Sequence, residues 1–392
     1  MKTVSQNRVG ALDALRGFAL FGILVVNLPF FAHPIYNFGA QSIAPDYADK
    51  IFEWLISFGF ELKFYVLFSF LFGYGLAVQL ARAGERGENL APRYFRRLSG
   101  LFVLGAVHAI FLFFGDIIIG YALLGCVLWL VRDWQPRKLL KLAGALVCLA
   151  ALTNIGLVWL AISFPQSDAE TLRLADEARR AYLGTFAESV NQRVQDWMIA
   201  FVFISFVNFP TALAMFALGL AAGKIRFFEN FARHRPTVNR ILSFALVVGI
   251  AGNFAFASFV GTNRFLIDAA VFALTAFAAP ALTFCYVVGI LRLHTGFAKF
   301  FTALQTAGKM SLTNYMLQSL VCGFLFNGYG LGWYDRVGAA AGFALAAGIF
   351  LFQIAFSVWW LSRFRFGFDE WLLRSWTYLK WQQWRANKQV QE

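Results

Sequence analysis

The amino-acid sequence predicts an all-α, polytopic membrane protein with about ten transmembrane helices. Three observations lead to this prediction: 59% of the 392 residues are hydrophobic, only 14% are charged, and ten apolar runs are each long enough to span a bilayer as a helix. The runs are continuous rather than alternating, so they lack the pattern that the strands of a membrane β-barrel require.

The predicted spans are taken in order along the chain. They cover residues 14–33, 57–81, 98–114, 116–132, 139–163, 197–222, 240–260, 265–291, 311–330 and 338–361. Because no internal repeat and no separate soluble domain interrupts them, we expect residues 1–392 to form a single integral membrane domain. The four cysteines all fall within apolar runs, which indicates small buried side chains rather than a disulfide framework.

The basic residues between the spans predict their orientation. Of the 34 Lys and Arg residues, 26 lie in alternate connections and in the two terminal segments. The positive-inside rule places these segments, and with them both termini, in the cytoplasm. Membrane topology therefore accounts for the net charge of +13, which does not indicate a nucleic-acid partner.

Two segments outside the spans have distinctive patterns. Residues 166–196 form the longest outer connection, in which Leu174, Ala178 and Tyr182 recur at helical spacing. This spacing allows an amphipathic helix on the outer surface, with a solvated helical loop as the alternative. Residues 362–392 are basic and rich in tryptophan, so we expect a cytoplasmic interfacial tail in contact with anionic lipid.

His108 and Asp116 are the strongest candidates for chemistry. They lie in an apolar stretch that is expected to form a helical hairpin turning at residues 114–116, with Tyr121 near the depth of His108. A charge at a bilayer centre costs at least about 2.5–3.5 kcal/mol, so such residues are usually functional. A carboxylate can orient an imidazole that acts as a general base. The alternatives are that Asp116 caps the following helix and that His108 is a packing residue.

Other polar residues in the first two spans have two or more interpretations. Arg16 either anchors the cytoplasmic end of its helix or binds an anion. Asn27, in the middle of the first span, either bonds to another helix or contacts substrate. Lys63 pairs with Glu61, reaches the outer interface, or points inward to meet Asp116. His33, at the outer end of the first span, is a secondary candidate.

A polar stripe begins the ninth predicted span. Ser311, Asn314, Tyr315 and Gln318 share one face of a helix, because they follow i, i+3, i+4 and i+7 spacing. We expect Asn314 and Gln318 to line a cavity and contact substrate, in preference to holding helices together. The sequence contains only four histidines, which do not cluster, so no metal site is expected.

Several segments together resemble the YeiB-type family of bacterial inner-membrane proteins, a domain of unknown function. The resemblance runs from residue 8 to about residue 380 and rests on RVGALDALRGFALFGILVVN, KFYVLFSFLFGYG, GAVHAIFLFFGDIIIGYALLG, GKMSLTNYMLQS and RFRFGFDEWLLRSWTY. The first segment is also similar to that of transmembrane acyltransferases such as heparan-alpha-glucosaminide N-acetyltransferase. That similarity implies a role for Asn27, and His33 is the nearest counterpart of the histidine that accepts the acyl group. The YeiB-type pattern carries its histidine at His108 instead.

Three functions follow from these observations. The first is a multi-pass acyltransferase of the bacterial inner membrane, which moves an acyl group from an acyl-CoA-type co-substrate such as acetyl-CoA to an envelope glycan, a lipid or a small amine or hydroxyl acceptor. The second is a small-metabolite transporter or exporter, in which Pro210 and Pro280 break two spans. The third is a non-catalytic scaffold that binds membrane lipid. A homodimer is compatible with each of them.

Overall fold

The computed structural model describes residues 2–37, 46–165, 167–294 and 296–386, and within these ranges the chain is helical and forms no strand. The helices are α1 (Lys2–Ala32), η1 (Ile35–Asn37), α2 (Tyr47–Gly59), α3 (Phe64–Glu85), α4 (Ala91–Phe111), α5 (Ile118–Leu130), α6 (Pro136–Ser163), α7 (Asp168–Leu183), α8 (Phe186–Lys224), α9 (Phe231–Phe259), α10 (Phe265–Leu293), α11 (Ala298–Lys309), α12 (Ser311–Phe326), α13 (Ala339–Leu361) and α14 (Phe368–Tyr378). The all-α class is therefore confirmed.

Seven segments of the described chain are long and apolar enough to cross a membrane. They are Gly10–Ala32, Tyr47–Glu85, Pro136–Ser163, Phe186–Lys224, Phe231–Phe259, Phe265–Leu293 and Ala339–Leu361. Of the remaining predicted spans, α5 and α12 have 13 and 16 residues, fewer than the roughly 20 that a bilayer requires. The structure supports a multi-pass membrane protein, and the count of ten stays a prediction.

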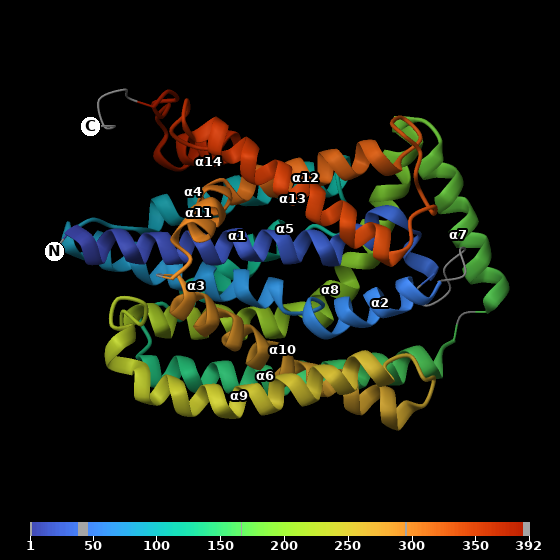
Figure 1. Ribbon diagram of the computed structural model, residues 1–392, viewed down its shortest axis with the longest axis horizontal. Helices are drawn as coiled ribbons and strands as arrows, with labels where there is room; N and C mark the ends of the chain where they lie inside the picture. Colours follow the sequence, from blue (N-terminus) through green and yellow to red (C-terminus); the bar gives the residue numbers. More distant parts are fainter. Residues whose placement is uncertain (1, 38–45, 166, 295, 387–392) are drawn as a thin grey trace.

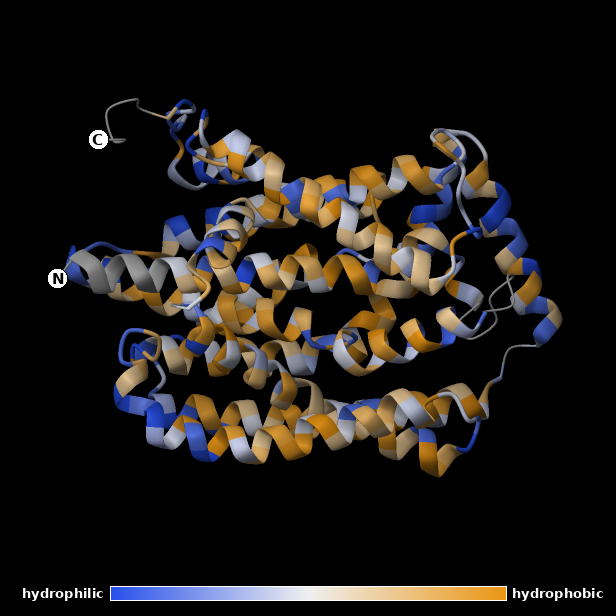
Figure 2. Cartoon of the chain, in the orientation of Figure 1, coloured by the Kyte–Doolittle hydropathy of each residue, from blue (hydrophilic) through white to orange (hydrophobic). Residues whose placement is uncertain are grey.

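The bundle has one polar end at the termini and another at α7. Both termini lie at the same end, which we call the termini end, and α7 crosses the opposite end, which we call the α7 end (Figure 1). Hydrophilic residues gather at these two ends, and hydrophobic residues cover the helices between them (Figure 2). This distribution matches a bilayer around the middle of the bundle. Which end faces the cytoplasm stays a prediction from the basic residues.

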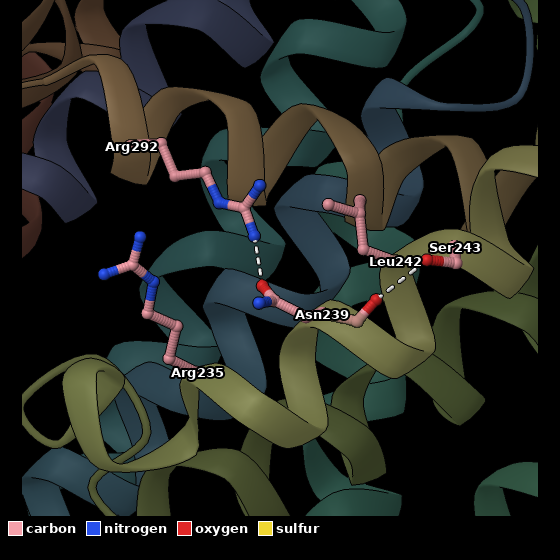
Figure 3. Close-up of a pocket in the computed structure, with 5 residues that line it drawn as sticks. All are labelled: Arg235, Asn239, Leu242, Ser243 and Arg292. Atoms are coloured by element: carbon pink, nitrogen blue, oxygen red, sulfur yellow. Dashed lines mark hydrogen bonds between the residues drawn. The ribbon is translucent and has the colours of Figure 1, made fainter.

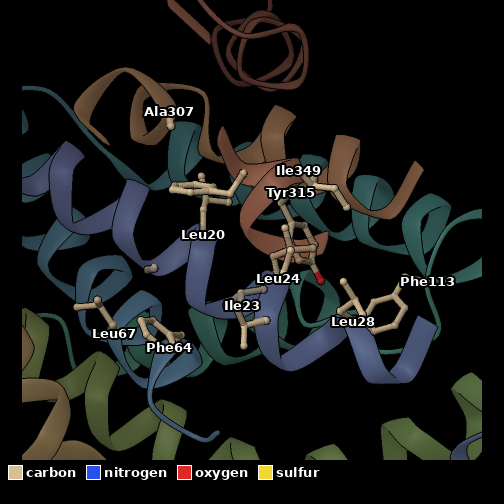
Figure 4. Close-up of a cluster of buried hydrophobic side chains, with 14 of the residues drawn as sticks. Leu20, Ile23, Leu24, Leu28, Phe64, Leu67, Phe113, Ala307, Tyr315 and Ile349 are labelled. Carbon is tan, nitrogen blue, oxygen red and sulfur yellow. The ribbon is translucent and has the colours of Figure 1, made fainter. Parts of the chain in front are cut away.

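Helix α1 runs through the centre, and the other helices pack around it. Leu20, Leu24 and Leu28 of α1 lie in one buried cluster with Phe113 and Tyr315 (Figure 4). Helix α10 contacts both α6 and α9, and the three helices form a layer along one edge (Figure 1). The centre of the molecule is therefore enclosed by protein, whereas many apolar side chains of α6 and α9 in this outer layer are exposed.

Close helix contacts depend on glycine at the centre of the bundle. A Cβ atom added at Gly73 of α3 would lie 2.0 Å from the carbonyl oxygen of Phe216 on α8. Any larger residue at that position would force the two helices apart, so the sequence FLFGYG permits the α3–α8 packing.

Two predictions about helix continuity were wrong, for the run 57–81 and for the two prolines. The run 57–81 is not one helix, because the chain turns at residues 60–63, where Leu62 adopts a left-handed conformation (φ +64°). The segment 166–196 contains α7 and the first turns of α8, where Thr185 caps α8 through a capping box with Glu188, and its place outside the membrane stays a prediction. Pro210 and Pro280 do not break their spans, and α8 and α10 continue through them.

The segment after residue 166 forms the helix α7, which corresponds to the amphipathic alternative from the sequence. Its inner face includes the buried residues Ala175, Ala178 and Tyr182. The predicted tail forms α14, which packs on α4 and α12, where the Glu370 carboxylate accepts hydrogen bonds from the backbone N–H groups of Leu312 (2.6 Å) and Thr313 (3.3 Å). Residues 387–392 of the predicted tail lie outside the described residues.

Candidate active site

The hairpin between α4 and α5 places Asp116 beside His108. Helix α4 ends at Phe111 and α5 begins at Ile118, so the predicted turn at residues 114–116 is confirmed. Asp116 Oδ1 accepts a hydrogen bond from the backbone N–H of Ile119 (2.9 Å), and Asp116 Oδ2 contacts Nδ1 of His108 (2.8 Å). One carboxylate therefore caps α5 and also holds the imidazole, and the two interpretations from the sequence hold together.

The hydrogen bonds of His108 determine which ring nitrogen is free to accept a proton. An ionised carboxylate only accepts hydrogen bonds, so Nδ1 of His108 carries hydrogen and donates to Asp116. In the neutral imidazole Nε2 is then an acceptor, and it lies 2.8 Å from Oγ of Ser319 on α12. The Ser319 hydroxyl donates to Nε2, with the Tyr315 carbonyl oxygen at 3.4 Å as a more distant acceptor.

These three side chains form a buried serine–histidine–aspartate chain. His108 is fully buried, Asp116 is 1% exposed and Ser319 is 2% exposed. The order of the groups is the order of nucleophile, base and orienting acid in hydrolases and acyltransferases that use an activated serine. Desolvation strengthens each of these contacts, because no bulk water competes for the hydrogen bonds.

Sequence reasoning did not select Ser319 as a site residue. The signal was present, because Ser319 is four residues after Tyr315 and eight after Ser311, which continues the predicted polar stripe along α12. The stripe was expected to contact substrate through its amides, and serine is common in helix contacts. Only the packing of α12 against α4 shows that this hydroxyl meets His108.

Tyr315 adds an unsatisfied donor to the same site. Its ring centroid lies 4.8 Å from that of His108, and its buried hydroxyl, which lies near the backbone of Ile117, donates no hydrogen bond in the described part of the chain. Leaving a buried hydroxyl unpaired costs about 1–3 kcal/mol, so such a group is often kept for a ligand or a transition state. The neighbouring cavity, lined by Phe113, Tyr182 and Arg193 among others, measures about 10 Å³ and has room for one water molecule.

Lys63 and Tyr121 do not contact the serine–histidine–aspartate chain. The Lys63 ammonium donates to the Ser57 carbonyl oxygen (2.7 Å), so of the three alternatives for Lys63 the contact with Asp116 is wrong. The reason is the turn at residues 60–63, which directs the side chain toward α2. The Tyr121 hydroxyl donates to the Tyr65 carbonyl oxygen (2.8 Å) and contacts Ser69 Oγ (2.8 Å), and within the described part of the chain it forms no hydrogen bond with His108.

Asn314 and Gln318 hold helices together. The Asn314 amide donates to the Ala307 carbonyl oxygen (3.1 Å) and to Ser357 Oγ (2.9 Å). The Gln318 amide donates to Gln353 Oε1 (2.9 Å) and, at 3.3 Å, to a carbonyl oxygen of α1. Both side chains are buried and bond to neighbouring helices, as the helix-contact alternative describes, and their contact with a substrate stays a prediction.

Three further candidates come from α1 and the turn after it. Arg16 forms an ion pair with Asp13 (2.9 Å), and Asn27 is half-buried with no hydrogen bond among the described residues. Nδ1 of His33 meets Asp335 Oδ1 (2.8 Å), and its Nε2 meets the carbonyl oxygen of Val337 (3.0 Å). Both nitrogens of His33 therefore face acceptors, which leaves neither free to act as a base.

The fold and this site define a class: a polytopic α-helical membrane protein with a buried serine–histidine–aspartate chain. Residues 222–380 match the family described as "Protein of unknown function (DUF418)". The chain belongs to this family, since it is 34% identical to the uncharacterized protein YxaH of Bacillus subtilis (strain 168), over 97% of this chain and 96% of the relative.

Two other relatives agree with this assignment and confirm the YeiB-type resemblance. The uncharacterized protein YeiB of Escherichia coli (strain K12) is 28% identical over 93% of this chain and 95% of the relative. An uncharacterized 39.9 kDa protein in the amylase 3' region of Bacillus acidopullulyticus is 26% identical over 95% of this chain and 94% of the relative. No solved structure matches the chain significantly.

Proposed function

We propose that the protein is a bacterial inner-membrane acyltransferase in which Ser319 carries the acyl group and His108 is the general base. The single observation that supports this proposal is the buried hydrogen-bonded chain Ser319–His108–Asp116, with contacts of 2.8 Å on each side of the imidazole. The donor is an acyl-CoA-type thioester from the cytoplasm. The acceptor is a hydroxyl or an amine on an envelope glycan, a lipid or a small molecule.

The first half of the reaction transfers the acyl group to the protein. Nε2 of His108 takes the proton of Ser319 as Oγ attacks the thioester carbonyl carbon, and a tetrahedral intermediate forms. The intermediate collapses when the carbon–sulfur bond breaks, and the leaving thiolate takes the proton from Nε2. The products are a free thiol and an ester on Ser319. The unpartnered hydroxyl of Tyr315 is the candidate donor to the oxyanion.

The second half reverses the roles of the oxygen atoms. The acceptor gives its proton to Nε2 of His108 as its oxygen or nitrogen attacks the ester carbonyl, and the proton then returns to the departing Ser319 Oγ. Asp116 stabilises the imidazolium formed in each half and keeps Nδ1 as the protonated nitrogen. The small cavity beside the site requires side chains such as Phe113 to move before a substrate enters.

Arginines at the termini end support an entrance for an anionic donor. Arg97 of α4 lies over the ring of Phe72 (5.3 Å), and the charges of Arg16 and Arg374 act on it. Among the described residues Arg97 has no acidic partner, whereas Arg93 pairs with Glu88. Arg97 and His108 are eleven residues apart on α4, which corresponds to about 16 Å along the helix axis. An extended thioester arm can cover that distance, with its phosphates held by the arginines.

The test is the covalent half-reaction of the purified protein in lipid nanodiscs with labelled acetyl-CoA. Wild-type protein is expected to release free thiol and to gain one acetyl group on the peptide that contains Ser319. Ser319→Ala removes the acceptor oxygen and His108→Ala removes the base, so each is expected to lower thiol release by roughly 10⁴-fold or more.

Ser69→Ala is the matched control, because Ser69 is a buried serine whose partner, Tyr121, is not part of the serine–histidine–aspartate chain. It is expected to retain wild-type release. Loss in His108→Ala with full activity in Ser319→Ala would show direct transfer from donor to acceptor and remove the acyl-serine step. Equal activity in all the variants would remove the acyltransferase proposal, and flux of an unmodified solute in vesicles would then favour transport.

A further inference from the structure

A pocket of about 240 Å³ opens between α9 and α10, away from the serine–histidine–aspartate chain. It is lined by Arg235, Asn239, Leu242, Ser243 and Arg292, which come from the beginning of α9 and the end of α10 (Figure 3). Both of these helix ends lie at the termini end of the bundle, in the polar region next to the hydrophobic middle (Figures 1 and 2). The volume is large enough for a phosphate group and its substituents.

The polar groups in this pocket are arranged as donors. The Arg292 guanidinium donates to Asn239 Oδ1 (2.5 Å), so the amide nitrogen of Asn239 is turned away from Arg292 and toward the side of Arg235 (Figure 3). In the described part of the chain, neither Arg235 nor Arg292 forms an ion pair with a carboxylate. Two guanidinium groups and one amide therefore face a common space without an anion to balance them.

The sequence around the pocket is depleted of acidic residues. Between residues 230 and 310 the chain has one carboxylate, Asp268, and seven Lys or Arg residues. Asp268 lies at the opposite end of the α9–α10 hairpin, where it accepts hydrogen bonds from Thr262. The charge of the two pocket arginines is therefore left for a ligand, and a guanidinium matches the geometry of phosphate oxygens.

The surface next to the pocket is apolar and exposed. Along α9, Phe244 is 71% exposed and directly follows the pocket residue Ser243, and Val247 is 69% exposed and lies about one turn after Ser243 toward the middle of the bundle. In a bilayer these side chains face acyl chains. A ligand with a phosphate group in the pocket and an apolar tail along α9 would match both surfaces.

We propose that this pocket binds a phosphate group, and that the headgroup of an anionic phospholipid is its source. The two guanidinium groups and the Asn239 amide hold the phosphate oxygens, and the exposed apolar side chains of α9 contact the lipid tails. The site is independent of the proposed acyl transfer, since none of its residues touches the His108 chain. A soluble phosphate ester is the alternative source of the same chemistry.

The experiment measures lipid bound to the delipidated protein by native mass spectrometry. The probes are phosphatidylglycerol, which is anionic, and phosphatidylcholine, which has the same phosphate but no net charge. Wild-type protein is expected to retain phosphatidylglycerol preferentially. Arg235→Gln and Arg292→Gln are each expected to weaken this binding about tenfold or more, because each removes a charge-assisted hydrogen bond.

Two further variants make the result specific. Asn239→Asp keeps the oxygen that accepts from Arg292 and places a negative charge in the pocket, so it is expected to abolish the preference. Arg264→Gln is the matched control, since Arg264 is an exposed arginine at the other end of the same hairpin, and it is expected to bind like wild type. Thermal unfolding checks that each variant is folded.

The outcomes separate the two sources and the failure of the proposal. Selective loss of phosphatidylglycerol in the pocket variants supports the lipid source. Saturable binding of inorganic phosphate that needs both arginines, without a lipid preference, moves the source to a soluble ester and overturns the lipid assignment. An equal loss in Arg264→Gln, or no binding of either probe, overturns the site. None of these readouts depends on acyl-transfer activity.

Discussion

The centre of the bundle and its α6–α9–α10 layer are built from equally apolar helices that meet different surroundings. In the most apolar window of α1, 61% of the residues are buried in the protein, whereas in that of α6 only 11% are. Hydrophobic side chains are therefore mostly enclosed by protein in α1, whereas in α6 most of them remain on the surface of the bundle. Hydropathy predicts that both cross a membrane, and it does not distinguish the two environments.

This difference in burial determines where polar side chains lie in the two regions. In the centre, polar side chains such as His108, Asp116 and Ser319 find partners on neighbouring helices, since protein surrounds them. In the outer layer the strongly charged residues, such as Arg235 and Arg292, lie at the helix ends near water. A lipid surface cannot satisfy a polar group, so the amides within the outer layer, such as Asn154, are buried and bond to a neighbouring helix.

The largest expected effect is on acetyl-CoA turnover, when a carboxylate in the centre is exchanged for an amide and the same exchange in the outer layer serves as the control. Asp116→Asn keeps the cap of α5 but no longer fixes Nδ1 of His108 as a donor, so acetyl-CoA turnover is expected to fall by about 10⁴-fold. Asp268→Asn, the control in the outer layer, is expected to leave turnover unchanged. Turnover per folded molecule is the measurement. Reduced abundance of Asp116→Asn at unchanged specific activity would assign Asp116 to capping alone.

The next prediction compares how tightly the helices pack in the two regions, through the thermal stability of two glycine-to-alanine variants. Gly73→Ala places a methyl group 2.0 Å from the Phe216 carbonyl oxygen, so α3 and α8 must separate and the unfolding temperature is expected to fall markedly. Gly156→Ala on α6 meets no atom within 4 Å and is expected to be neutral or stabilising by up to about 1 kcal/mol. Thermal unfolding in detergent measures both. Equal shifts in the two variants would contradict the difference in packing.

A third comparison concerns α7, which is attached to the α7 end by one of its arginines. Arg179 donates to Asp335 (2.5 Å), and Asp335 also holds His33, so Arg179→Gln leaves a buried carboxylate short of a partner. Such a loss costs about 1–3 kcal/mol, and α7 is expected to be cleaved faster by a protease. Arg173→Gln breaks only exposed ion pairs on the same helix and is expected to cleave at the wild-type rate.

The smallest effect is expected for hydrogen bonds between helices. Gln318→Leu removes two bonds in the centre, to Gln353 and to Leu20, and Asn154→Leu removes the bond from α6 to Phe272 in the outer layer. Such bonds contribute about 0.6 kcal/mol each in membrane proteins, so Gln318→Leu should destabilise by about twice as much. Denaturant unfolding tests this ratio. If Gln318→Leu instead blocks donor turnover at full stability, the sequence-based assignment to substrate binding is restored.

Local patterns were sufficient for several features of this protein. Continuous apolar runs predicted the all-α membrane class, and the spacing of Ala178 and Tyr182 predicted the helix that α7 forms. His108 and Asp116 are eight residues apart across a glycine turn, so a hairpin could hardly keep them separate. In each case the interacting groups are close in sequence, and helix periodicity or chain connectivity fixes their relative positions.

Tertiary packing decided the rest. Ser319 lies 211 residues after His108, and the two meet only because α12 packs beside α4. The amide of Gln318 turns to Gln353 of α13 for the same reason, and Lys63 turns away from Asp116 because of one left-handed residue, Leu62. The sequence by itself determined which residues are helical and where polar groups interrupt apolar runs. Their partners depended on which helix faces are neighbours, which is a property of the whole packed bundle.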